Sequence, residues 1–170
     1  YCIPESEEWI EEMLMYAQRP DVGVVSANIW DNKGQSYFAG GVLDQDSLTG
    51  IHVINKGMDK ADQGYEANMR HVRNTTTASG ICMMVPERTF EKIGDFSTEM
   101  QDCADIDLCL RSREKGLWNV WACFADVAYA GDNTAEDYWK QCDLFKKKWK
   151  ETIEAGDEFY HPLLKALKKI

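Results

Sequence analysis

The feature that most constrains the fold is a nearly continuous apolar run, VGVVSANIW, at residues 22–30. A short apolar run without polar alternation is typical of a β-strand that is covered on both faces. Pro20 precedes it, and DNKG at 31–34 follows it with the composition of a turn. Because a strand buried on both faces needs a layer on each side, this run predicts an α/β architecture.

The segments around this strand alternate between strand-like and helix-like patterns. Further strands are expected within 36–44, 75–87 and 117–131, and helices within 6–21, 87–94, 105–116, 135–156 and after Pro162. Ser6 is the predicted N-cap of the first helix, and Gly94 and Gly116 are predicted to end the next two. The polar, glycine-rich stretch 45–72 is predicted to be a long loop. The predicted fold is a mixed sheet flanked by helices, with C-terminal helices added.

The strand count is low for a self-sufficient α/β sheet, and the chain begins at Tyr1 rather than at Met. Both features predict that these 170 residues are part of a longer protein. No apolar run is long enough to span a membrane, and the acidic N-terminus does not resemble a signal peptide.

The charge of the chain excludes one class of partner and leaves another open. The net charge is −10, which argues against nucleic-acid binding, since that binding depends on lysine and arginine neutralising phosphates. From 141 to 170, however, seven lysines stand against five acids. This basic C-terminus is interpreted as a solvated helix face, with peripheral contact to a membrane surface as the alternative.

The six cysteines have no C-x-x-C spacing, and most lie inside apolar segments. They are interpreted as buried free thiols in a reducing compartment, which predicts a cytoplasmic protein, with the inner face of the membrane as an alternative position. The three histidines are scattered, so the sequence proposes no zinc site.

The stretch MQDCADIDLCLRSREKG holds three aspartates, Asp102, Asp105 and Asp107, where an amphipathic helix is expected to begin. One interpretation is structural: Asp105 or Asp102 caps the helix, and Asp107 favours the helix dipole. The other is chemical, because a carboxylate at a helix N-terminus can serve as a general base. Residue chemistry alone favours the cap.

The motifs EEWIEEML, VGVVSANIWDNKGQSYFAGG and TASGICMMVPERTFEKIGDF occur in this order, followed by ADIDLCLRSREKGLWNVW at 104–121. Together they resemble the second, acceptor-side half of a family-two glycosyltransferase of the GT-A, or nucleotide-diphospho-sugar transferase-like, fold. The resemblance implies that 1–131 is this acceptor-side half and that 132–170 is a C-terminal helical extension. The aspartate motif is its most specific part.

The resemblance also implies an activity and roles for single residues. Asp105 would be the catalytic base of an inverting transfer from a nucleotide-diphospho-sugar donor to a hydroxyl of a glycan acceptor. Asp102 would touch the acceptor, and the strand end with Thr77, Ser79 and Gly80 would line the acceptor side. The intact enzyme would use a divalent cation, Mg²⁺ or Mn²⁺. These residues alone are expected to lack transferase activity, because the donor-binding half would precede Tyr1.

The sequence departs from the family pattern in three places. Ala104 stands where relatives carry Glu or Asn, and GDFST replaces Gly-Gly-Phe-Asp-Glu. At the end of the strand that contains NVW, Tyr129 or Ala130 stands where relatives often have a histidine that helps bind the metal, so no metal ligand is assigned. These departures favour the alternative function, a non-catalytic glycosyltransferase-like module that binds a partner or a glycan.

Overall fold

The computed structural model describes residues 2–131 and 142–160 of the chain. The helices are α1 (Trp9–Ala17), α2 (Glu87–Ile93), α3 (Ala104–Glu114), α5 (Asp143–Lys148) and α6 (Lys150–Ala155), with 3-10 turns η1 (Tyr65–Arg70) and η2 (Thr98–Cys103). The strands are β1 (Cys2–Pro4), β2 (Val22–Trp30), β3 (Ser36–Phe38), β4 (Gly41–Leu43), β5 (Ile51–Val53), β6 (Arg73–Thr75), β7 (Met83–Met84) and β8 (Trp118–Tyr129).

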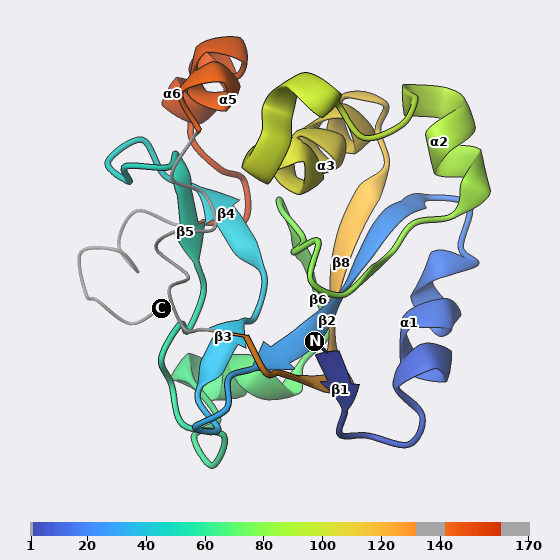
Figure 1. The fold of residues 1–170 in the computed structure, drawn as a ribbon, viewed down its shortest axis with the longest axis vertical. Coiled ribbons are helices and arrows are strands. Elements are labelled where there is room, and N and C mark those ends of the chain that lie inside the picture. The colour runs from blue at the N-terminus through green and yellow to red at the C-terminus, as the bar shows by residue number, and fades with distance from the viewer. Residues whose placement is uncertain (1, 132–141, 161–170) are drawn as a thin grey trace.

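The main sheet is built around β2 and β8, which pair in parallel through the middle of the molecule (Figure 1). The shorter strands β1 and β6 pair with β8, and β3 and β7 pair with β2, all antiparallel. A separate antiparallel pair, β4 and β5, stands beside this sheet. The result is a curled, mixed sheet with flanking helices, consistent with the predicted partial nucleotide-sugar-transferase-like fold.

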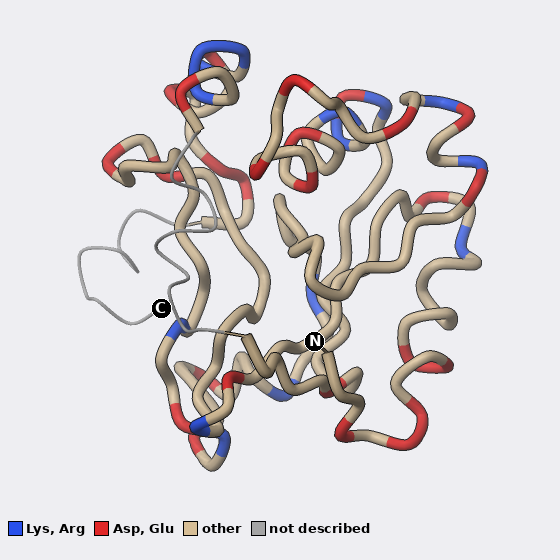
Figure 2. Tube along the Cα trace, viewed as in Figure 1, with Lys and Arg blue, Asp and Glu red and all other residues tan. Residues whose placement is uncertain are grey.

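Every residue of β2 is buried, which confirms the strand predicted from the apolar run at 22–30. Charged residues lie mostly on the helices and loops around the sheet, whereas the central strands carry few of them (Figure 2). One cluster of buried apolar side chains joins α1, β2, β8 and α3 to α5 and α6. The described part of the C-terminal extension therefore packs on the same core as the rest of the chain.

Four details differ from the sequence prediction. The region 45–72 is not only loop, because it contains β5 and η1. The expected strand at 75–87 is reduced to the end of β6 at Thr75 and to β7, with a connecting segment between them. In the described part of 135–156 two short helices meet at Trp149 instead of forming one long helix. Ser6 does not cap α1, whose first flanking residue is Glu8.

The prediction of free thiols is wrong for two of the six cysteines, because Cys103 and Cys142 form a disulfide. The other four cysteines are free. The spacing of 39 residues between the bonded pair has no recognisable motif, so only the packing of the C-terminal helices against α3 brings the two sulfurs together.

The helix predicted after Pro162 lies outside the described residues. In residues 2–131 and 142–160, no helix has the length and apolar character needed to cross a membrane.

Candidate functional site

Asp105 is the second residue of α3 and is almost completely buried, with 5% of its surface exposed. Its Oδ2 accepts a hydrogen bond from the Gly80 backbone N–H at 2.8 Å, and its Oδ1 accepts one from the Ile106 N–H at 2.8 Å. The N-cap of α3 is Cys103, and no side chain caps the helix. The structure therefore does not use Asp105 as the N-cap; it uses the carboxylate to join α3 to the segment before β7.

A tight turn presents Gly80 to this carboxylate. The Ser79 carbonyl accepts the Cys82 N–H at 3.3 Å, and the Ser79 Oγ accepts the Ile81 N–H at 3.3 Å. These bonds occupy the neighbouring amides and leave the Gly80 N–H directed toward Asp105. Two motifs 25 residues apart in the sequence thus meet at one hydrogen bond.

An open pocket of about 270 Å³ lies at this junction. Gly80, Asp102 and Asp105 line it, and its remaining walls are formed by Met83, Phe96, Gln101 and Ala104. Asp102 is exposed, so one solvent-accessible carboxylate and one buried, hydrogen-bonded carboxylate line the same pocket. Gln101 has φ 44° and ψ −117°, a conformation that non-glycine residues rarely adopt and that often occurs near functional sites.

The structure places the other two predicted residues away from this pocket. Ser79 is buried and supports the turn that presents Gly80. Thr77 is completely buried against the start of β4, where a Cβ added to Gly41 would lie 2.2 Å from its Oγ1. The structure therefore brings Asp105, Asp102 and Gly80 together at the pocket. Ser79 supports the turn that holds Gly80, and Thr77 lies under the neighbouring strand pair.

Asp107 lies on the same helix as Asp105 but has a different environment. It is fully buried, and its Oδ1 accepts hydrogen bonds from Lys148 Nζ at 2.5 Å and Trp149 Nε1 at 2.9 Å. Its Oδ2 accepts one from Arg111 Nε at 2.8 Å. Burial raises the pKa of Asp107, but the bonds from Lys148, Trp149 and Arg111 outweigh it, and the pKa lies below its ordinary value.

Arg111 extends this arrangement to the end of α2. Its guanidinium also donates to the carbonyls of Ile93, at 2.5 Å, and Asp95, at 2.8 Å. Asp107 and Arg111 therefore hold α3 between α2 and the C-terminal helices. Sequence reasoning missed Lys148 and Trp149 as partners of Asp107, because they lie in the lysine-rich segment that was interpreted as a solvated face.

The described residues contain no group of three or more His, Cys, Asp or Glu side chains placed to hold a metal ion. The carboxylates of Asp102 and Asp105 alone do not make a divalent-cation site, so no chemical step is assigned to a metal here.

Comparison with known proteins gives two distant relatives. The chain is 28% identical over 169 residues to the uncharacterized protein y4gI of Sinorhizobium fredii, and 26% identical over 168 residues to the O-antigen biosynthesis protein RfbC of Myxococcus xanthus. Each match covers 92% of this chain but only 18% and 12% of the respective relative. The chain thus spans less than a fifth of the length of these relatives. No protein-family model and no solved structure matches it.

Proposed function

We propose that this chain is the acceptor-side part of an inverting glycosyltransferase that acts in glycan biosynthesis. The observation that carries the proposal is the buried Asp105 carboxylate, fixed on the Gly80 N–H at the wall of a pocket of about 270 Å³. The distant similarity to a protein named for O-antigen biosynthesis supports a role in building a glycan. The mixed sheet with flanking helices fits a fold of the nucleotide-sugar transferase type.

In this proposal the pocket receives the acceptor hydroxyl, and Asp105 removes its proton. The oxygen attacks the anomeric carbon of a nucleotide-activated sugar, the bond from that carbon to the nucleotide breaks, and the configuration inverts. A base must keep its orientation as the proton moves, and the two backbone donors hold the carboxylate in place.

Other parts of the acceptor site have weaker support. Asp102 is exposed at the rim, where its carboxylate can accept from an acceptor hydroxyl, and Phe96 offers an exposed ring. Ser79 acts by holding the Gly80 turn, and Thr77 acts by packing. The nucleotide-sugar donor and a divalent cation, Mg²⁺ or Mn²⁺, would be held by residues outside those described here.

We also propose a cytoplasmic location, which the four free cysteines favour, whereas the Cys103–Cys142 disulfide is more typical of an oxidising compartment. Lys148 is paired with the buried Asp107, so it is one lysine fewer for peripheral membrane contact through the basic C-terminus.

The test is Asp105→Asn in the full-length protein that contains this chain. The amide keeps the shape of the side chain and its oxygen can still accept from one of the two backbone N–H groups, but its NH2 group cannot accept from the other and it cannot take a proton. We expect sugar transfer to fall by about 10²- to 10⁴-fold, with donor binding retained and the melting temperature lowered only as far as the loss of one hydrogen bond requires. Asp143→Asn, at an exposed position on α5, is the matched control and should leave transfer unchanged.

The alternative is a glycosyltransferase-like binding module without catalysis. The observation in its favour is that both Asp105 oxygens accept backbone N–H groups, which a purely structural carboxylate would also do. If Asp105→Asn lowers the melting temperature but leaves transfer intact, Asp105 is structural and the base assignment is wrong.

A further inference from the structure

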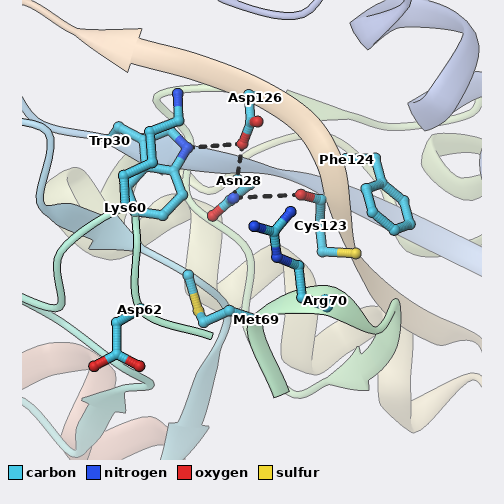
Figure 3. Close-up of a pocket in the computed structure, with 9 residues that line it drawn as sticks. All are labelled: Asn28, Trp30, Lys60, Asp62, Met69, Arg70, Cys123, Phe124 and Asp126. Carbon is cyan, nitrogen blue, oxygen red and sulfur yellow. Dashed lines mark hydrogen bonds between the residues drawn. The ribbon is translucent and has the colours of Figure 1, made fainter. Parts of the chain in front are cut away.

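A second pocket lies where the pairing of β2 with β8 is interrupted. Ala27 pairs with Ala122, but the next residue, Asn28, pairs with Asp126, so residues 123–125 bulge out of β8. Bulges of this kind are often found next to binding sites, because they redirect side chains and free backbone groups from the ladder. Figure 3 shows the pocket at this bulge.

The floor of the pocket is a buried polar network. Asn28 Nδ2 donates to Asp126 Oδ1 at 2.8 Å and to the Cys123 carbonyl at 3.3 Å, and Trp30 Nε1 donates to the same Asp126 oxygen at 2.7 Å. These bonds fix the Asn28 amide, so its oxygen must point the other way (Figure 3). Asn28 is 2% exposed, and its Oδ1 has no hydrogen-bond partner in the described part of the chain.

A buried acceptor without a donor requires an explanation, because nearly all such groups in native proteins are satisfied. The pocket has a volume of about 100 Å³. One ordered water needs only about 10–15 Å³ on this measure, so there is room for a group much larger than a single water.

The charges around the pocket are balanced, which argues against an anion as the ligand. Lys60 and Arg70 are matched by Asp62 and Asp126. The Lys60 ammonium is already paired with Glu5 at 2.8 Å and lies over the Trp30 ring.

The remaining walls offer one donor and apolar surface. Arg70 is exposed, has no ion-pair partner among the described residues, and directs its guanidinium toward Asn28 and the Cys123 carbonyl (Figure 3). Met69 and the exposed ring of Phe124 form apolar walls.

A ligand that suits this pocket must donate to Asn28 Oδ1, accept from Arg70 and place a weakly polar face on Phe124. Hydroxyl groups both donate and accept, and a sugar ring carries them next to C–H faces that pack on aromatic rings. We propose that this pocket is a saccharide-binding subsite for one hydroxyl-rich sugar ring. It shares no lining residue with the Asp105 pocket, so the proposal does not rest on the proposed transferase activity.

The test is a titration of the isotope-labelled chain with methyl α-glucoside, methyl α-mannoside and methyl α-rhamnoside, followed by NMR. The reporters are the Trp30 indole N–H and the Asn28 amide N–H groups, which both bond to Asp126. We expect at least one glycoside to shift both signals with saturation. Arg70→Gln should weaken that binding about tenfold, whereas Lys92→Gln, at an exposed position on α2 outside the pocket, should not.

Arg70 is used because an exposed residue can be changed without risk to the fold, whereas Asn28 is part of the core. Inorganic phosphate serves as the anion probe. The proposal is overturned if no glycoside moves the Trp30 signal, if only phosphate does, or if Arg70→Gln binds the glycoside as tightly as the unchanged chain. Loss of transfer in Asp105→Asn would not affect any of these outcomes.

Discussion

At the scale of single residues, two aspartates on α3 differ in the groups that hydrogen-bond to them and in whether they face a pocket. Asp105 is held by two backbone N–H groups and faces a pocket. Asp107 is enclosed and accepts from two cations and an indole. A carboxylate surrounded by charged donors is suited to hold elements together, whereas one at a pocket wall can meet a substrate. The two positions therefore have different expected phenotypes.

Asp107→Asn should destabilise the protein strongly at neutral pH. The amide keeps the size of the side chain but leaves Lys148 and Arg111 without their buried counter-charge, and breaking such a pair lowers the free energy of unfolding by about 3 kcal/mol. Urea unfolding measures this loss. Asp21→Asn is the matched control, because its ion pair with Arg19 is exposed to solvent and should contribute little to stability.

The unchanged chain and Asp107→Asn should also differ in how their stability depends on pH. The pKa of Asp107 is lowered by folding, so its stabilisation is complete above the unfolded value, about 3.9, and is lost as the pH falls through the lower folded value. The difference in unfolding free energy between the unchanged chain and Asp107→Asn should therefore shrink below about pH 4. A difference that stays constant into this acid range would show that the charge of Asp107 is not what stabilises the fold.

At the scale of elements, the bulge in β8 is held by a residue outside the sheet. Ser6 Oγ donates to the Phe124 carbonyl at 3.1 Å and accepts from the Asp126 N–H at 3.2 Å, while the Asp126 carbonyl accepts the Glu5 N–H at 2.9 Å. A bulge leaves backbone groups without ladder partners, and Ser6 satisfies two of them. The serine that was predicted to cap α1 thus stabilises β8.

Ser6→Ala should lower the free energy of unfolding by about 1–2 kcal/mol, because two backbone groups lose their partner. The location of the effect distinguishes the two roles. Hydrogen exchange should increase at the Asp126 amide and remain unchanged in the first turn of α1. Faster exchange confined to the start of α1 would mean that Ser6 acts as the helix cap after all.

At the scale of the whole molecule, the Cys103–Cys142 disulfide joins the residue before α3 to the residue before α5. Asp107 and Trp149 join the same two regions, and Phe145, Trp149 and Ile153 belong to the main core cluster. The described C-terminal helices are thus attached by a covalent bond, a buried polar contact and apolar packing. The disulfide and the polar contact reach the chain two residues before and two residues after Asp105.

Cys142→Ser should lower the free energy of unfolding by about 2–4 kcal/mol, since the bond closes a loop with a sequence separation of 39. Thermal unfolding with and without a reducing agent is the measurement. Reductant should lower the melting temperature of the unchanged chain but not of Cys142→Ser. Cys82→Ser, at a free and half-buried thiol, should still respond to reductant. Equal melting curves for all three proteins would exclude a stabilising disulfide.

Much of the local structure was predictable because it depends on nearby residues. The apolar run at 22–30 predicted β2, and the glycines after α2 and α3 predicted where these helices end, since both glycines have positive φ. The strand at 75–87 was not predictable in its observed form, because the Ser79–Cys82 turn interrupts it and the Gly80 N–H in that turn bonds to Asp105, 25 residues away.

The sequence by itself determined the α/β class, the buried strand and the helix that carries the three aspartates. These follow from periodicity, turn residues and charge, which act over short distances along the chain. Only the tertiary structure decided that Gly80 meets Asp105, that Thr77 lies under β4, that Cys103 pairs with Cys142 and that Asn28 lines a second pocket. These contacts join residues 25 to 98 positions apart, and no local pattern encodes which distant partner a buried polar group or thiol will find.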